Sequence, residues 1–372
     1  MVIDYRCFTR SDLEIWARDL GLPAFRGRQL FSWLWRPGFR DFSQMTDFPK
    51  ALREKVAQKG LLTKPELEAE QRSVDGTSKF AWRLPDDSVV ESVLIPEQGR
   101  KTLCISSQVG CAMGCRFCHT ARMGFRRQLI PSEIAGQALA VLERTGERER
   151  LRNLVFMGMG EPLANYGNVL KSIHILTDDL GLNFSLRRIT VSTCGLIPEI
   201  LRLGRDTDVG LAVSLNAPDD KTRDRIMPVN SRYPLPQLIE ACRNYRLSRR
   251  RRITFEYILL AGVNDSIEQA VSLARLLKGI PLKINLIPFN ESPDIPFRRP
   301  VNERVLAFQQ VLKETGYTTI IRKSKGQDIS AACGQLYAEL KRPKKSLVKS
   351  WPKFRINDIH GTSSIPKLYG TN

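Results

Sequence analysis

The chain has 372 residues, 42% of them hydrophobic, which is enough apolar material for one large core with smaller additions at its ends. Lysine and arginine total 58 against 39 acidic residues, and the net charge of +19 favours a nucleic-acid partner over a merely basic soluble protein. No apolar run reaches the roughly 20 residues of a membrane span, so we expect a cytoplasmic protein without a membrane partner. In that reducing compartment, eight cysteines indicate metal or redox chemistry rather than a disulfide scaffold.

The first predicted element is helical and runs from Ser11 to about Leu62. Phe31 and Leu34 belong to an apolar face at helical spacing, and arginines are interleaved with that face. These arginines suit contact with a phosphate backbone, although a solvated basic face explains them equally well. We predict a small helical accessory domain over residues 1–75 that contacts nucleic acid.

Strand patterns begin near Ser78. Lys79–Leu84 and Val89–Ile95 predict a β-hairpin, which makes residues 76–96 a linking extension. Strands and helices then alternate along the chain. The expected strands are Thr102–Ser107, Asn153–Met157, Arg188–Ser192, Val209–Ser214, Ile253–Leu260 and Leu282–Pro288. The expected helices are Pro131–Glu143, Asn168–Leu176, Pro198–Leu203, Pro236–Tyr245, Ile267–Leu277 and Asn302–Glu314.

This alternation predicts an α/β fold with parallel strands and right-handed crossovers. It gives about six βα units, which are too few for the usual eight-fold barrel. We therefore expect a partial (β/α)6 barrel over residues 97–328, with its reactive groups at the carboxyl ends of the strands. Residues 346–372 form a basic tail without periodicity, which we expect to be flexible.

A cysteine-rich loop, from Gly110 to Cys118, follows the first predicted barrel strand. Cys111, Cys115 and Cys118 have the spacing C-x-x-x-C-x-x-C. Three thiolates on so short a loop can hold three irons of a 4Fe–4S cluster and leave the fourth iron open to a substrate. The alternative is a structural zinc site, which requires four ligands. His119 directly follows Cys118 and is poorly placed to bind the same ion, so the spacing favours the cluster.

Glycines and small polar residues follow the other predicted barrel strands, where they are expected to meet at one mouth of the barrel. Taken singly, each is typical of a turn. Together they suit the ribose, adenine and ammonium groups of a nucleoside ligand. These strand-end stretches contain Gly160, Glu161, Ser192, Ser214, Leu215, Asn216 and Asn290.

The cluster spacing, with Phe117 before the last cysteine, resembles that of the radical S-adenosylmethionine superfamily. From about Phe25 to Leu340 the chain resembles the RlmN/Cfr family of radical RNA methyltransferases. The resemblance implies a 4Fe–4S cluster on Cys111, Cys115 and Cys118 whose open iron binds S-adenosylmethionine. It also implies that the strand-end residues named above contact this cofactor.

Methylation of adenine carbon 2 is difficult because that carbon is electrophilic, and a thiolate that carries the methyl group offers a radical route. Cys333, in the sequence Ala-Ala-Cys-Gly-Gln-Leu, and Cys104 are candidate thiols, although buried cysteines are commonly structural. The resemblance implies that Cys333 becomes S-methylcysteine, that Cys104 forms a transient disulfide with it, and that Glu91 accepts a proton. Residues 329–345 are then the catalytic-cysteine segment. We interpret Cys194 as structural.

The resemblance implies methylation of adenosine carbon 2 in 23S rRNA, at the peptidyl transferase centre, and 3′ of the anticodon in some tRNAs, using two S-adenosylmethionines in turn. Pro162 and the segment from Gly124 to Leu129 favour this subgroup over its carbon-8 relatives. A flavodoxin-type electron donor and a monomeric state are further expectations. The alternatives are carbon-8 methylation, a radical enzyme with a different substrate, and a non-catalytic, zinc-stabilised RNA-binding protein.

Overall fold

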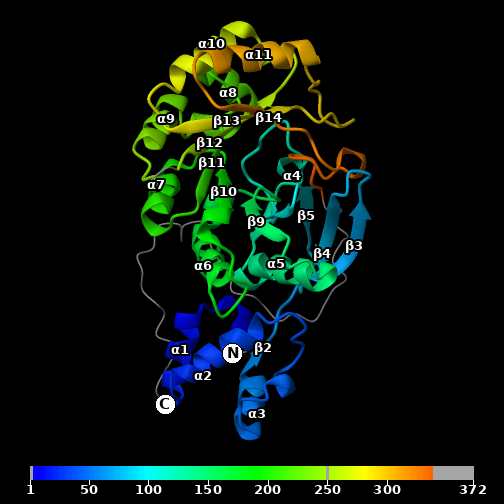
Figure 1. The fold of residues 1–372 in the computed structure, drawn as a ribbon, viewed down its shortest axis with the longest axis vertical. Coiled ribbons are helices and arrows are strands. Elements are labelled where there is room, and N and C mark those ends of the chain that lie inside the picture. Colours follow the sequence, from blue (N-terminus) through cyan, green and yellow to red (C-terminus); the bar gives the residue numbers. More distant parts are fainter. Residues whose placement is uncertain (1–2, 249–250, 338–372) are drawn as a thin grey trace.

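The computed structural model describes residues 3–248 and 251–337, so the predicted tail lies outside the described residues. Its central feature is a ten-stranded sheet around which the helices are arranged (Figure 1). In spatial order the strands are β14 (Thr319–Ile321), β13 (Leu282–Pro288), β12 (Ile253–Leu259), β11 (Gly210–Ser214), β10 (Ile189–Thr193), β9 (Leu151–Phe156), β6 (Arg100–Cys104), β5 (Val89–Glu97), β4 (Ser78–Arg83) and β3 (Glu66–Arg72).

Seven neighbouring strands of this sheet pair in parallel, and a helix follows most of them: β6, β9, β10, β11, β12, β13 and β14. This confirms the α/β class and the parallel barrel strands expected from the alternating pattern. Each predicted strand and helix is present. The predicted barrel helices are α5 (Pro131–Thr145), α6 (Tyr166–Thr177), α7 (Ile197–Asp206), α9 (Leu235–Arg243), α10 (Ile267–Leu276) and α11 (Asn302–Glu314). The sequence did not predict α8 (Asp220–Ile226), which follows β11.

The predicted hairpin, β4 and β5, continues the same sheet in the antiparallel sense. Strand β5 pairs with β6, and β3 adds an outer strand beside β4. The sequence pattern did not predict β3 because Glu66–Arg72 is rich in charged and polar residues, most of them exposed. Charged side chains on an edge strand disfavour pairing with other chains.

The N-terminal module lies at one end of the molecule, below α5 and α6 (Figure 1). The single helical stretch expected there is wrong in detail, because turns divide it into α1 (Arg10–Asp19), α2 (Phe25–Leu34) and α3 (Lys50–Lys59). Arg6 is 2% exposed and donates to the carbonyl oxygens of Leu34 and Thr63 at 3.0 and 3.3 Å, which joins the separate pieces. Among the described residues, no helix is long and apolar enough to span a membrane.

Candidate active site

The three predicted cluster cysteines lie on a loop that a short hairpin closes. Strands β7 (Gln108–Gly110) and β8 (Phe125–Gln128) pair at its base, and the helical turn α4 (His119–Arg122) follows Cys118. Gly110 has a φ of 74°, and a Cβ there would lie 1.7 Å from the carbonyl oxygen of Gly124. Only glycine permits this close approach. The loop therefore returns tightly on itself and presents the cysteines on one side.

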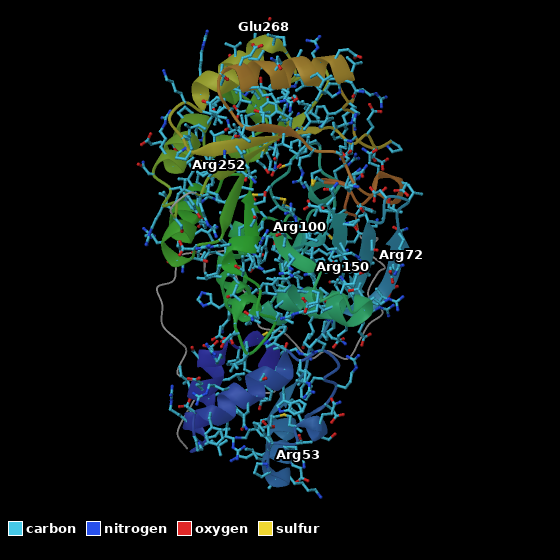
Figure 2. The ribbon with its side chains drawn as sticks, viewed as in Figure 1. Arg53, Arg72, Arg100, Arg150, Arg252 and Glu268 are labelled. Atoms are coloured by element: carbon cyan, nitrogen blue, oxygen red, sulfur yellow. The ribbon has the colours of Figure 1, made fainter. Side chains whose placement is uncertain are left out.

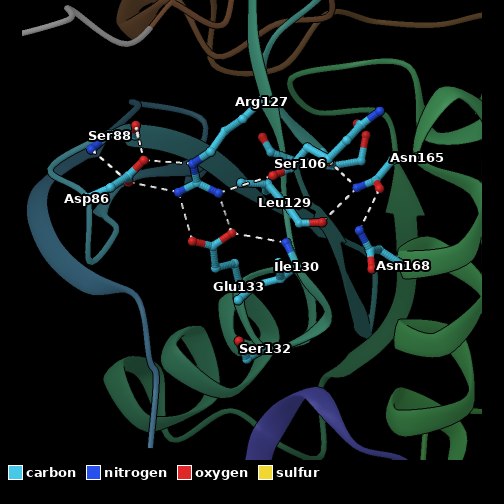
Figure 3. Close-up of polar contacts among 12 residues, drawn as sticks. Asp86, Ser88, Ser106, Arg127, Leu129, Ile130, Ser132, Glu133, Asn165 and Asn168 are labelled. Atoms are coloured by element: carbon cyan, nitrogen blue, oxygen red, sulfur yellow. Dashed lines mark hydrogen bonds and ion pairs between the residues drawn. The ribbon is translucent and has the colours of Figure 1, made fainter. Parts of the chain in front are cut away.

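Arg127 fixes the base of this hairpin (Figure 3). Its guanidinium donates to Asp86, in the turn between β4 and β5, at 2.7 and 2.8 Å. It also donates to Glu133, in the first turn of α5, at 2.7 and 2.8 Å. Glu133 in turn accepts from the N–H of Ile130 and caps the helix. One arginine thus joins the cysteine loop, the β-hairpin and the first barrel helix.

The surroundings of the cysteines suit thiolates bound to iron. Burial raises the pKa of Cys111 to about 12 and also raises the pKa of Cys118, so neither ionises easily without a metal. Backbone amides of Met113 and Glu161 favour the Cys111 thiolate, as do those of Thr120 and Ala121 for Cys118. Amides directed at sulfur are typical of iron–sulfur ligands.

A single-ion site is not apparent in the same place. Within residues 3–248 and 251–337, no three His, Cys, Asp or Glu side chains converge as ligands of one metal ion. The three cysteines instead share the wall of one pocket. This donor set fits a multi-iron cluster that faces a ligand better than a closed zinc site.

The pocket brings together most of the residues expected from the sequence. It opens at the carboxyl ends of the parallel strands, where a partial barrel is expected to bind its ligand. The predicted residues that line it are Cys111, Cys115, Cys118, Gly160, Glu161, Ser192, Ser214, Asn216 and Cys333.

Glu161 is the buried carboxyl group of this pocket. One of its oxygens accepts from the N–H of Leu163 at 3.1 Å and the other from the N–H of Cys194 at 2.8 Å. Burial raises its pKa, although these amide hydrogen bonds favour the ionised form. The conformation of its strand end depends on Gly160, with a φ of 100°, where a Cβ would lie 2.5 Å from the Gln108 side chain.

Leu215 and Asn290 do not line the pocket, in contrast to the other predicted cofactor contacts. Leu215 is fully buried, and its N–H donates to the carbonyl oxygen of Glu256. Asn290 accepts a hydrogen bond from Gln327 at 2.8 Å. Leu215 thus connects the end of β11 to β12 beside Glu256, and Asn290 is bonded to the segment that precedes Cys333.

Cys333 lines the same pocket as the cluster cysteines, on a segment that lies beside the cluster loop. It is solvent accessible, and the N–H of His119 donates to the carbonyl oxygen of Gly334 at 2.8 Å, so the two segments are joined. Surrounding protein raises the pKa of Cys333, and the charge of Glu256 raises it further, whereas Arg322 lowers it.

Cys104 ends β6 and is 7% exposed. Burial raises its pKa, and the next largest cause is the negative charge of Cys333. The two thiols are therefore near enough to interact electrostatically, and both are free. Cys104 does not line the pocket itself.

Glu91 is not the solvent-facing strand residue that an isolated glutamate suggests, since it is 4% exposed. It forms an ion pair with Lys79 at 3.2 Å and accepts from the N–H of Tyr337 at 2.9 Å. Burial raises its pKa, partly offset by Lys79. Glu91 therefore connects β5 to the segment that carries Cys333.

Three residues that the sequence did not single out contribute to this site. Cys194, which was interpreted as structural, lines the pocket together with Glu256. Arg223 is fully buried and donates to the carbonyl oxygens of Leu215 and Cys194 at 3.0 and 2.6 Å, so it joins two strand ends. No local motif marks these residues, because their roles depend on which strands are neighbours.

The parallel strands and the cysteine loop define a radical S-adenosylmethionine enzyme, and the model of that superfamily matches residues 105–274. A second family model, described as the N-terminal domain of a ribosomal RNA large subunit methyltransferase, matches residues 4–61.

The chain belongs to the RlmN family of radical S-adenosylmethionine RNA methyltransferases. It is 53% identical to the dual-specificity RNA methyltransferase RlmN of Desulfotalea psychrophila, over 90% of this chain and 94% of that protein. The corresponding values for the Geobacter sulfurreducens protein are 50%, 93% and 95%. A crystal structure of a radical SAM methyltransferase from Sphaerobacter thermophilus is 46% identical, covers 91% of this chain and 100% of that one, and has a TM-score of 0.85.

Family membership identifies the cofactors as a 4Fe–4S cluster and S-adenosylmethionine. Family membership also decides between the functional classes that the sequence left open. A non-catalytic zinc protein and a radical enzyme with a substrate other than RNA are both set aside.

Proposed function

We propose that this enzyme methylates carbon 2 of adenosine in 23S rRNA and in a subset of tRNAs, and that Cys333 carries the methyl group. The observation that supports this most directly is that Cys333 and the three cluster cysteines line one pocket. Relatives at about half identity bear the name dual-specificity RNA methyltransferase. Pro162, which follows Glu161, favours carbon 2 over carbon 8 by its likeness to that subgroup.

The bound cluster and S-adenosylmethionine supply an electrophilic methyl group and a radical that removes hydrogen from unactivated carbon. We assign Cys111, Cys115 and Cys118 as the iron ligands. Gly160, Glu161, Ser192, Ser214 and Asn216 offer backbone and polar groups that suit an amino acid and a ribose. Leu215 and Asn290, which do not line the pocket, hold neighbouring segments in place. The Asn216 side chain is fixed in place, since its Oδ1 accepts from the N–H of Ile258 at 2.8 Å.

Each remaining residue has one role. Cys333, as a thiolate, accepts the methyl group and later holds it against carbon 2 of the adenine. Glu91 accepts the proton that leaves this carbon, a role that suits a buried carboxyl group with a raised pKa. Cys104, as a thiolate, then attacks the Cys333 sulfur: the disulfide forms, the bond between Cys333 and the methyl carbon breaks, and that carbon keeps the electron pair and takes up a proton to become the methyl group.

RNA is expected to contact several basic surfaces. Figure 2 shows Arg53 on the N-terminal module and Arg252 beside the sheet, at well-separated places. Arg298 and Arg299 are exposed near the barrel mouth. Such side chains neutralise phosphates and give affinity without reading sequence. We further propose that a flavodoxin-type protein supplies the electrons and that the enzyme acts as a monomer.

The test uses RNA treated with methyl-labelled S-adenosylmethionine, digested to nucleosides and compared with 2-methyl- and 8-methyladenosine by mass spectrometry. The label is expected in 2-methyladenosine. Cys333→Ala is expected to leave the RNA and the protein unlabelled, whereas Cys242→Ala, which removes a buried thiol outside the pocket, keeps the activity. Label in 8-methyladenosine, or none in RNA, contradicts the proposal.

A further inference from the structure

Glu256 is a buried carboxyl group in the pocket to which neither the cluster nor the methyl transfer assigns a role. It lies on β12 and is 9% exposed. In the register of the sheet its neighbours are Ser214 on β11 and Asn285 on β13, so three polar residues form a row across the barrel strands. Glu256 and Ser214 line the same pocket as Cys333.

Only one of the two carboxyl oxygens of Glu256 has a partner within the described part of the chain. Asn285 donates its Nδ2 to Oε1 at 2.8 Å and fixes the orientation of the group. No hydrogen bond or ion pair from another described residue reaches Oε2. With Oε1 fixed by Asn285 and the residue on the pocket wall, Oε2 is an oriented acceptor that is open to a ligand in the pocket.

Glu256 also lies close to the cysteine that must touch the RNA base. Its charge is the largest cause, after burial, of the raised pKa of Cys333. An adenine ring that lies against the Cys333 sulfur would therefore also lie near this carboxyl group. The one hydrogen-bond donor on the adenine base is its exocyclic amine, and a carboxyl oxygen is a suitable acceptor for it.

We infer that Oε2 of Glu256 accepts a hydrogen bond from the exocyclic amine of the target adenine, which makes Glu256 a specificity-determining residue. The inference rests on the proposed function, because it takes the base methylated next to Cys333 as its ligand. The adenine of S-adenosylmethionine carries the same amine. Proximity to Cys333 assigns Glu256 to the target base, and the experiment separates the two sources.

The test compares RNA substrates that carry adenine or purine, which lacks the amine, at the target position. Wild-type enzyme, Glu256→Met and Glu256→Asp are measured with both RNAs. Thr254→Val is the matched control, since Thr254 is a buried polar residue of the same strand that does not line the pocket. Methylation of Cys333, read by mass spectrometry of the protein without added RNA, reports on use of S-adenosylmethionine.

Wild-type enzyme and Thr254→Val are expected to prefer adenine over purine in kcat/KM. Glu256→Met is expected to lose roughly tenfold or more of this preference, as for one buried hydrogen bond to a charged group. Methylation of Cys333 should continue in that variant, and Glu256→Asp should recover part of the preference. Iron content confirms that each variant holds its cluster.

An unchanged preference for adenine in Glu256→Met overturns the inference. Loss of Cys333 methylation in Glu256→Met and Glu256→Asp, with iron retained, also overturns it, because Glu256 would then serve S-adenosylmethionine. Failure of the proposed function is a separate result: wild-type enzyme would place no methyl group on adenine carbon 2 of either RNA.

Discussion

Asp75 ties the loop before Cys333 to the β-hairpin. It lies in the turn between β3 and β4 and accepts from the N–H groups of Thr77 and Gly326 at 2.9 and 3.0 Å. Asp328 completes the connection, since it accepts from Ser73 at 2.6 Å. Asp75→Asn removes the charge and places the side-chain NH2 group against one of the two backbone N–H donors. The hydrogen bonds that join this turn to the loop before Cys333 should therefore be lost.

The magnitude follows from two independent routes. Hydrogen bonds to a charged group contribute about 1.5 to 3 kcal/mol. Burial alone would raise the pKa of Asp75, but hydrogen bonds from Thr77 and Gly326 lower this pKa to about 2. By linkage that depression corresponds to about 2.5 kcal/mol at neutral pH, reduced to about 2 kcal/mol because solvent screens this partly exposed carboxyl group. Because the folded pKa is depressed, this stability is present above the ordinary aspartate pKa and is lost as the pH falls toward 2.

The assay is urea unfolding of cluster-free protein at pH 7 and pH 3. Asp75→Asn should be about 2 kcal/mol less stable than wild type at pH 7, and the difference should fall to roughly half at pH 3. Asp87→Asn, in the next turn at a φ of 62°, is the control and should change little, because asparagine tolerates that conformation. A difference below about 0.5 kcal/mol at pH 7, or one that does not narrow in acid, would refute the reasoning.

Three further expectations follow from the same structure. Arg127→Met should lower the free energy of unfolding in urea by about 3 kcal/mol, because Glu133, whose side chain is 3% exposed, loses its cationic partner. Asp86→Asn should lower it by less than about 1 kcal/mol, and equal losses in the two variants would contradict this reasoning. The Arg298→Ala, Arg299→Ala double variant should weaken RNA binding and reduce the slope of log affinity against log salt by about 2, with iron content unchanged; an unaltered slope would argue against phosphate contact. Cys111→Ala should lose cluster iron in a colorimetric assay while Cys242→Ala keeps it, and iron retained by Cys111→Ala would remove that residue from the ligands.

Most of the fold could be predicted from the sequence because most barrel strands are strand-like apolar stretches with an amphipathic helix between them and the next strand. The misses share a physical reason. Helix α8 has a polar sequence without an apolar face, β14 is only three residues long, and β3 is an edge strand of mostly exposed residues. Each of them is stabilised by the neighbours it meets after folding, and its own pattern does not indicate it.

The residues of the site also divide into those that a local sequence pattern predicts and those that it does not. The cluster cysteines could be predicted because their spacing is local, and one short loop presents all three. Glu256 and Arg223 could not. A lone strand glutamate acquires meaning only through the register of β11, β12 and β13, and a lone helix arginine only through the neighbouring ends of β10 and β11. Glu91 was named by resemblance alone, and its burial beside the Cys333 segment has no local sequence signal.

The role of Cys333 as methyl carrier is tested most directly in Cys104→Ala. Without the second thiol, nothing breaks the bond between the Cys333 sulfur and the methyl carbon once that carbon has joined the base. The variant is incubated with RNA and S-adenosylmethionine and then digested with nuclease and protease. Mass spectrometry of the peptide that contains Cys333 should find an adenosine joined to its sulfur through one carbon. Free 2-methyladenosine at the wild-type rate, with no adduct on Cys333, would contradict the account.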